Sequence, residues 1–211
     1  MLRALFARRN SAYADVRQCT LSLRDAATAA AISSIYQKIF GSDPWNEGFR
    51  CPVCKAIYPL GHKRRICDAC QPGLQVLLVD FWPRHRVLED FYKEMNNPGA
   101  RLFLAHADEG IVGFAWGYEV SVTAEHALEL DAPGLEHRLH GRHFYIDEVG
   151  LLLPYRAKGV GKQLVSHLIE GQEVGRVFYR TLAYSPMHRL GESLGGRVVQ
   201  HISEHRVIIL I

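Results

Sequence analysis

The sequence contains no run of about 18 apolar residues, which excludes a segment long enough to cross a bilayer as a helix. Its first ten residues carry Arg3, Arg8 and Arg9 around a short, interrupted apolar stretch that does not match a secretory signal. The formal net charge of +3 is too small by itself to predict nucleic-acid binding. We therefore expect a cytoplasmic globular protein, with no role at a membrane and with a basic N-terminal tail over residues 1–13.

The 211 residues, 48% of them hydrophobic, suffice for one domain that buries about 70% of its unfolded surface. The sequence has no internal repeat and no low-complexity tract. Residues 45–75 have little periodicity and hold four of the five cysteines. We expect a domain over residues 14–211 that is interrupted by an insert at 45–75, in a monomer or a homodimer.

Apolar periodicity predicts the order of the helices and strands. Asp25 is a candidate cap for the first helix, and the Asp-Glu-Gly sequence at 108–110 predicts a hairpin turn. The predicted strands are 15–24, 101–107, 111–120, 144–153, 177–184, 197–202 and 206–211, with a short extended piece at 77–81. The predicted helices are 26–40, 83–95, 159–174 and 187–194.

The segment 155–162 predicts a phosphate-binding turn between a strand and a helix. Gly159 and Gly161 let a ligand approach the backbone, and the helix start leaves N–H groups without partners. Arg156, Lys158 and Lys162 add positive charge where the helix dipole already favours an anion.

Two nucleotide-binding loops are excluded by their spacing. In a Walker loop, Arg156 would stand at the first glycine, and Gln163 would replace the hydroxyl that binds Mg²⁺. In a dinucleotide fingerprint, Leu164 would stand at the third glycine. What is left is Arg-x-x-Gly-x-Gly at the start of a helix.

This pattern resembles motif A of the GNAT superfamily of acetyl-CoA-dependent N-acetyltransferases, and the element order is similar to the GNAT order. Residues 110–117 resemble the third strand of that family, so the resemblance covers residues 14–211 apart from the insert. It implies a GNAT-type α+β sandwich, with a mixed, mostly antiparallel sheet flanked by helices, and acetyl-CoA as cosubstrate. One departure is that Leu153 stands where the family commonly has proline, which shifts the bend to Pro154.

The resemblance also implies which residues bind coenzyme A. The backbone of the strand would bind the pantetheine arm, and the turn would bind the phosphates. The implied residues are Val149, Leu151 and Leu153 for the arm, and Arg156, Ala157, Lys158, Gly159, Val160, Gly161 and Lys162 for the phosphates. A backbone N–H near Leu151 would stabilise the developing oxyanion.

The implied reaction requires a group that takes a proton from the incoming ammonium. Asp147 and Glu148 lie in an otherwise apolar strand, where a carboxylate is costly unless it is paired or solvated. Because adjacent strand residues face opposite sides, we expect only one of them to enter the cleft. We choose Glu148 as general base or substrate anchor, ahead of Asp147. The alternative is a structural salt bridge or a charge at the edge of the sheet.

The leaving thiolate needs a proton, and many relatives supply it from a tyrosine four residues before a glycine. Residues 193–196 resemble that ending, and the tyrosine position is Gly191. Tyr184 and His188 are candidate substitutes, although aromatic packing explains Tyr184 equally well, and water is a further alternative. The general acid is therefore not assigned by the sequence.

The insert contains two Cys-x₂-Cys pairs that are separated by twelve residues. This spacing predicts a structural Zn²⁺ site of zinc-ribbon type with the ligands Cys51, Cys54, Cys67 and Cys70. A pair of disulfides and free thiols are the alternatives, and disulfides are disfavoured without a secretory signal. A closed Cys₄ shell leaves no open position, so we expect the zinc to shape the acceptor wall without taking part in the chemistry.

The leading function hypothesis is an acetyl-CoA-dependent N-acetyltransferase that acts on a small-molecule or peptide amine. One alternative is a CoA-binding zinc-ribbon interaction protein without turnover. Another is an acetylase associated with nucleic acid or protein, with the basic residues 62–65 as the docking site. Those basic residues are better explained as solvated charges, so nucleic acid is not the expected partner. The His-containing segment 121–142 permits a metal site, but a mobile polar flap over the cleft explains it better.

Overall fold

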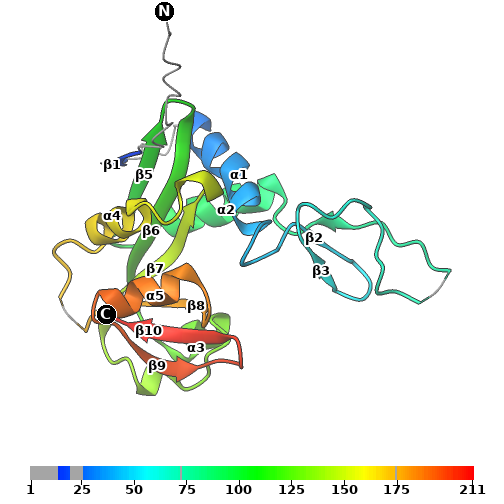
Figure 1. Ribbon diagram of the computed structural model, residues 1–211. Helices are drawn as coiled ribbons and strands as arrows, with labels where there is room; N and C mark the ends of the chain where they lie inside the picture. Colours follow the sequence, from blue (N-terminus) through cyan, green and yellow to red (C-terminus); the bar gives the residue numbers. More distant parts are fainter. Residues whose placement is uncertain (1–13, 20–25, 72, 174) are drawn as a thin grey trace, which may run out of the picture.

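The computed structural model describes residues 14–19, 26–71, 73–173 and 175–211. The predicted N-terminal tail and the cap at Asp25 lie outside these residues. The helices and strands follow the predicted order (Figure 1), and the fold is a mixed α+β sandwich around a mostly antiparallel sheet. Within the described residues, no helix is long and apolar enough to cross a bilayer.

Seven strands form the main sheet in the order β1-β5-β6-β7-β8-β10-β9. Every neighbouring pair is antiparallel except β7 and β8, which run parallel. The strands are β1 (Asp15–Gln18), β5 (Arg101–Ala107), β6 (Gly110–Ser121), β7 (Arg142–Leu151), β8 (Val177–Leu182), β9 (Arg197–His201) and β10 (Arg206–Leu210).

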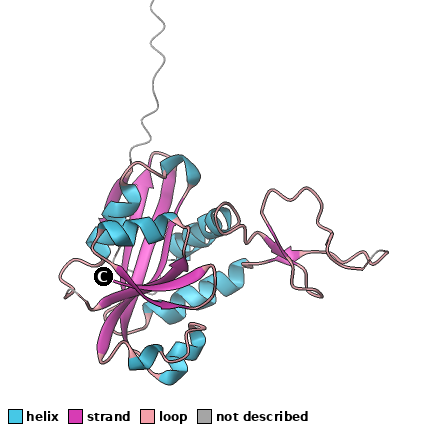
Figure 2. Ribbon diagram, turned by 60° about the horizontal axis from the view of Figure 1, so that its bottom comes forward, coloured by secondary structure: helices cyan, strands magenta, loops and turns pink. Residues whose placement is uncertain are grey.

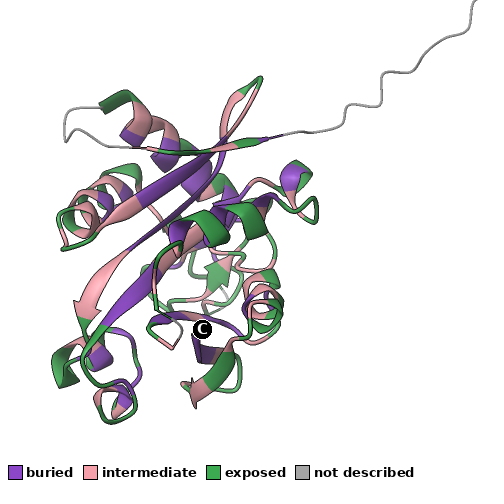
Figure 3. Ribbon diagram, turned by 90° about the vertical axis from the view of Figure 1, so that its left-hand side faces the viewer, coloured by how far each residue is buried: buried purple, intermediate pink, exposed green. Residues whose placement is uncertain are grey.

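Helices cover both faces of this sheet (Figure 2). On one face, α1 (Ala26–Phe40) and α2 (Arg84–Met95) pack against the β5 and β6 side chains Leu102, Leu104, Phe114 and Trp116. On the other face, α4 (Val160–Leu168) packs against the alternate residues of the same strands, such as Phe103 and Ala105. Helix α5 (Pro186–Ser193) lies against β8 on this face. Because both faces are buried, the central strands are buried along most of their length (Figure 3).

The sheet divides between β7 and β8. These two strands pair only at the start of β8 and near the start of β7, Phe144 with Val177 and Tyr145 with Phe178. Beyond this short parallel ladder no β7–β8 pairing occurs within the described residues. The main cavity of the protein has walls from both strands beyond this point.

Strand β7 ends earlier than the sequence predicts. It stops at Leu151, and residues Leu153–Tyr155 form a 3-10 helix with Pro154 in its first turn. Proline fixes its own φ and lacks an N–H for the ladder, so it ends the strand. Helix α4 also ends early, at Leu168.

The prediction of a mobile polar flap over the cleft at 121–142 is only partly right: Glu129 and Asp131 line the cavity, but the segment is packed on the sheet. This segment contains α3 (Ala124–Glu129) and a 3-10 helix at Leu135–His137. Its apolar residues are buried against Tyr145, Phe178 and Ile208 of the sheet. They are Val122, Ala127, Leu130, Ala132, Leu135 and Leu139. The polar residues between them concealed this apolar face in the sequence.

The cysteine-containing segment forms a separate three-stranded sheet that projects from the body (Figure 1). Its strands β2 (Phe49–Arg50), β3 (Ile57–Tyr58) and β4 (Val79–Asp80) have the order β3-β2-β4. Among its described residues, only Phe49, Cys51, Cys67 and Leu78 are buried in its core. We call residues 49–80 the cysteine insert.

Candidate active site

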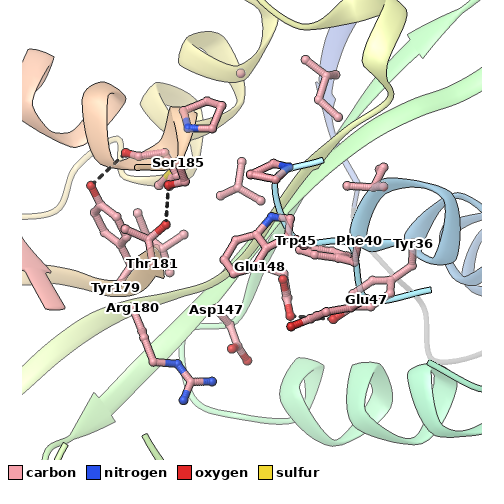
Figure 4. A pocket seen from close by; sticks show the side chains of 18 of the residues that line it. Tyr36, Phe40, Trp45, Glu47, Asp147, Glu148, Tyr179, Arg180, Thr181 and Ser185 are labelled. Carbon is pink, nitrogen blue, oxygen red and sulfur yellow. Dashed lines mark hydrogen bonds between the residues drawn. The ribbon is translucent and has the colours of Figure 1, made fainter. Parts of the chain in front are cut away.

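A cavity of about 600 Å³ lies where β7 and β8 separate (Figure 4). One end is formed by the turn after β7 and the start of α4, and the other by α1, the base of the cysteine insert and the start of α2. The wall between these ends comes from β7, β8 and α5. The cavity therefore joins the segment that the sequence predicts to bind phosphate with the segment that contains Asp147 and Glu148.

The turn before α4 has the geometry of an anion site. Gly159 is the N-cap residue of α4, has a left-handed conformation with φ +85°, and the helix has no side-chain cap. The first N–H groups of such a helix have no partner within it, and they favour an anion. A Cβ at Gly159 or at Gly161 would meet no atom within 4 Å, so both backbones border open space. Lys162 adds a positive charge at the cavity wall.

Arg156 lies at the same end but is held by the protein itself. Its Nε donates to the carbonyl of Leu151 at 2.9 Å, and its Nη1 donates to the carbonyl of Asp43. Arg156 therefore connects the end of β7 to the loop before the cysteine insert, in addition to lining the cavity.

The structure brings most of the predicted coenzyme A residues to this cavity. Seven of the ten line it, namely Val149, Leu151, Arg156, Ala157, Gly159, Gly161 and Lys162. The other three lie elsewhere. Leu153 is 65% exposed on the 3-10 helix, Val160 is buried in the main core, and Lys158 is exposed outside the cavity.

Asp147 and Glu148 both line the cavity, so the prediction that only one of them enters the cleft is wrong. The ladder between β6 and β7 shifts by one residue, because Trp116 pairs with Glu148 whereas Gly117 pairs with Ile146. Asp147 is the extra residue of a β-bulge, which breaks the alternation of faces. Figure 4 shows both carboxylates leaving β7 toward the same side.

Glu148 is positioned by α1. The hydroxyl of Tyr36 donates to Glu148 Oε1 at 2.7 Å. Burial raises the pKa of Glu148 well above its ordinary value, and the nearby charge of Asp147 adds to this, while the hydrogen bond from Tyr36 opposes it. Glu148 is therefore a carboxylate that accepts a proton readily.

Asp147 belongs to a second, half-buried acid pair. Burial raises its pKa to about 6, although hydrogen bonds from Glu94 and Tyr118 oppose the rise. Glu94, on α2, has its pKa raised to about 10, first by burial and then by the charges of Asp147 and Glu148. At neutral pH Glu94 is consequently protonated and donates to Asp147, while its Oε2 accepts from Trp116 Nε1 at 2.7 Å. The group can hold and release a proton near a cationic ligand.

Sequence reasoning missed Glu94, Tyr36 and Glu47. Glu94 carried a signal, because it falls at helical spacing from the buried Val87 and Phe91 and so lies on the buried face of α2. Glu47 lines the cavity and accepts from Trp82 Nε1 at 3.0 Å. Tyr36 had no distinguishing signal, since an aromatic residue on the apolar face of a helix is ordinary core.

Two aromatic residues bear on the missing tyrosine at Gly191. Tyr184 is 56% exposed, contacts His205 and does not line the cavity. Tyr179 of β8 lines the cavity, and its hydroxyl donates to the carbonyl of Met187 at 3.2 Å. A Cβ at Gly191 would lie only 1.7 Å from this hydroxyl. Tyr179 therefore occupies the space that a side chain at position 191 would need.

We expect Gly191→Ala to destabilise the protein by about 1 to 3 kcal/mol, because it overpacks a buried site. An ordinary glycine-to-alanine change inside a helix stabilises by about 1 kcal/mol, so the sign is diagnostic. In a Tyr179→Phe background the cost should shrink, since the clashing oxygen is gone. Urea unfolding of the four proteins measures this coupling, and equal costs in both backgrounds would contradict the proposed contact.

The four cysteines of the insert come together as the sequence predicts. Their Sγ atoms all lie within 4.8 Å of one another, with Cys51–Cys70 at 3.6 Å and Cys54–Cys67 at 3.4 Å. All four are free thiols. A tetrahedral zinc with Zn–S bonds of about 2.3 Å requires sulfur atoms roughly 3.8 Å apart, which this cluster approaches.

Comparison with known proteins agrees with this geometry. Similar solved structures include PH1933 from Pyrococcus horikoshii (12% identity, 92% of this chain and 96% of that chain, TM-score 0.57). A GNAT-family protein from Desulfovibrio desulfuricans matches with 11% identity over 94% of this chain and 98% of that one, TM-score 0.51. A protein from Corynebacterium glutamicum, described as histone acetyltransferase HPA2 and related acetyltransferase, matches with 17% identity. The match covers 93% of this chain and 94% of that one, with a TM-score of 0.50.

At these identities the structural matches show the fold alone, and no curated protein matches the chain. The family model of the acetyltransferase (GNAT) family matches residues 68–184, which is more than half of the sequence. The split between β7 and β8 and the uncapped turn before α4 both lie within the matched residues. This match shows that the chain belongs to the GNAT family of acetyltransferases.

Proposed function

We propose that the chain transfers an acetyl group from acetyl-CoA to a primary amine, by direct attack within a ternary complex. The observation that carries this proposal is the single cavity with an anion-binding turn at one end and raised-pKa carboxylates at the other. Each end suits one of the two substrates.

The donor end fits a pyrophosphate. The N–H groups at the start of α4 and the side chain of Lys162 supply hydrogen bonds and positive charge. The open space at Gly159 and Gly161 lets the phosphates reach the backbone. The exposed edge of β7 at Val149 and Leu151 is available to the pantetheine arm.

At the acceptor end, Glu148 takes a proton from the ammonium, which frees the nitrogen lone pair. The nitrogen attacks the thioester carbonyl, a C–N bond forms, and the C–S bond breaks. The products are the acetylated amine, the CoA thiol and one proton returned to solvent. Asp147 keeps a negative charge beside the ammonium site, because the hydrogen bond that it accepts from the protonated, neutral Glu94 favours its ionised form.

The cysteine insert is proposed to hold a structural zinc. Its thiols approach tetrahedral spacing, and the backbone N–H of Cys54 contacts Cys51 Sγ at 3.4 Å. With four protein ligands the metal has no open position, so its role is structural. Such a site requires reduced cysteines, which agrees with the expected cytoplasmic location.

The test is the release of free CoA thiol from acetyl-CoA in the presence of a panel of amines. We expect Gly161→Val to weaken acetyl-CoA binding about tenfold or more, because its side chain fills the space where a phosphate would lie. Gly61→Val is the matched control, since Gly61 also borders open space with ordinary backbone angles but lies in the insert. Titration calorimetry with acetyl-CoA measures both, and equal affinities would contradict the donor site.

One observation favours a second candidate, a protein that binds coenzyme A without turnover. Position 191, which bears the thiolate-protonating tyrosine in many relatives, is a glycine whose neighbouring space is filled by Tyr179. Tight binding of CoA, with no thiol released for any amine, would support this candidate over the enzyme.

A further inference from the structure

Arg50 brings a cation from the cysteine insert into the acceptor end of the cavity. Arg50 is the last residue of β2 and directly precedes Cys51 in the sequence. Its neighbour on β2, Phe49, faces the small core of the insert. Adjacent strand residues point to opposite sides, so Arg50 faces away from that core, and it lines the cavity. Its guanidinium lies over the ring of Phe81, with Cζ at 5.5 Å from the ring centroid.

The side chain of Arg50 has unused hydrogen-bonding capacity. Its Nε is buried and has no acceptor. Among the residues that the structure describes, no carboxylate or carbonyl pairs with its guanidinium. A buried donor without a partner costs about 1 to 3 kcal/mol, so a ligand that supplies an acceptor is favoured.

The other arginines around the cavity already have partners. Arg180 pairs with Asp131 at 3.3 Å, Arg206 with Glu47 at 3.9 Å, and Arg86 with Asp90 at 3.6 Å. Arg156 donates to two backbone carbonyls. Arg50 is therefore the arginine of the described cavity wall that is best able to bind an external anion.

An aromatic wall connects Arg50 to the proposed base. The Phe81 ring packs on Trp82 at 5.1 Å, and Trp82 packs on Tyr36 at 5.4 Å. Tyr36 donates to Glu148, and Trp82 donates to Glu47. All of these side chains line the same cavity. A ligand along this wall meets carboxylates at one end, apolar rings in the middle and a guanidinium at the other end.

We propose that the acceptor is an amine with a distal anionic group, a carboxylate or a phosphate, which is bound by Arg50. The proposal rests on the acetyltransferase function and specifies its substrate class. The ammonium lies at Glu148, an apolar spacer lies against Trp82 and Phe81, and the anion pairs with Arg50. The insert thereby contributes to acceptor choice through one residue at its base.

The experiment compares ω-amino carboxylates of increasing length, the matching ω-aminoalkyl phosphates and the alkylamines without the anion, by thiol release. For at least one length, the wild-type protein should prefer an anionic acceptor over its alkylamine about 10- to 100-fold in kcat/KM. The carboxylate and phosphate series identify which anion is preferred.

Arg50→Gln should remove this preference by lowering kcat/KM for the anionic acceptor alone. The alkylamine rates and the KM for acetyl-CoA should stay unchanged, and Arg50→Lys should restore part of the preference. Arg64→Gln, an exposed arginine in the same insert, is the matched control and should behave as wild type. Circular dichroism and metal content verify that each variant is folded.

Three results would overturn the proposal. The first result is that the wild-type protein uses alkylamines and their anionic counterparts with equal kcat/KM. The second result is that Arg50→Gln lowers kcat/KM equally for the anionic acceptors and the alkylamines, which would indicate a structural role. The third result is that thiol release is absent with every amine tested, in which case the proposed function fails and this inference fails with it.

Discussion

Glu148→Gln is expected to lower kcat/KM for the amine about 10²- to 10⁴-fold, the usual contribution of a positioned general base. Glutamine keeps the shape of the side chain and an oxygen that can accept from Tyr36, so the hydrogen bond at 2.7 Å is retained. What is lost is the ability to take a proton. Because binding of acetyl-CoA does not involve this proton, its affinity should be unchanged.

The pH profile gives an independent test. The base must be ionised to act, and burial raises its pKa above 4.5, the ordinary value for a glutamic acid. Activity should therefore fall as pH decreases through the raised pKa, and rise to a plateau above it. Because Glu148 and Asp147 interact, the midpoint of this pH profile belongs to the pair and not to Glu148 alone. The pKa of Asp147 is raised to about 6. Glu148→Gln should flatten this acidic limb.

The matched control is Glu89→Gln, an exposed carboxylate on α2. Asp147→Asn separates the two candidate bases. If Asp147→Asn abolished turnover while Glu148→Gln left it intact, Asp147 would be the base and our assignment would be wrong.

Removal of zinc should unfold the cysteine insert and leave the seven-stranded sheet folded. The insert has strands of two residues and four buried core residues, too few to be stable alone. Several of its large apolar side chains, among them Leu77 at 69% exposed, are not buried. A structural zinc in small domains contributes about 10 to 16 kcal/mol of apparent binding free energy, enough to account for the fold of the insert.

Metal analysis of the purified protein should find one zinc per chain, and Cys51→Ser should reduce it. Backbone NMR should then show loss of dispersed signals from residues 49–80 only. Cys19→Ser, outside the cluster, is the matched control. Because Arg50 is adjacent to Cys51, the chelated protein should also lose its affinity for the acceptor but keep that for acetyl-CoA. Unchanged acceptor kinetics in a chelated, otherwise folded enzyme would refute the proposed role of the insert.

The sequence predicted the fold well where local chemistry decides it. The apolar strands are buried on both faces, so they read as continuous hydrophobic runs, and the helices show clear periodicity. The turn from Arg156 to Lys162 leads from β7 into α4 as predicted, because glycine and proline end a strand and begin a helix locally; its role as a phosphate site stays a prediction. The four cysteines were recognisable because their spacing is local.

The errors arose where distant parts of the chain determine the result. The β-bulge at Asp147 depends on how β6 pairs with β7, and the residue types in β7 do not predict it. The packing of Leu135 and Leu139 depends on the far end of the sheet. The clash between Tyr179 and position 191 joins a strand to a helix. In each case a register or a contact, rather than a composition, sets the structure.

The separation of β7 from β8 also bears on how this protein avoids aggregation. Strands that lack a neighbour present unpaired N–H and C=O groups and can pair with other chains. Here the inner edges of β7 and β8 beyond Tyr145 and Phe178 face the cavity between them. A ligand can reach these edges, whereas a β-strand from another molecule would have to pass α4, α5 and the base of the insert. The opening that we propose to admit the substrates is therefore bordered by unpaired strand edges that helices and the base of the insert flank.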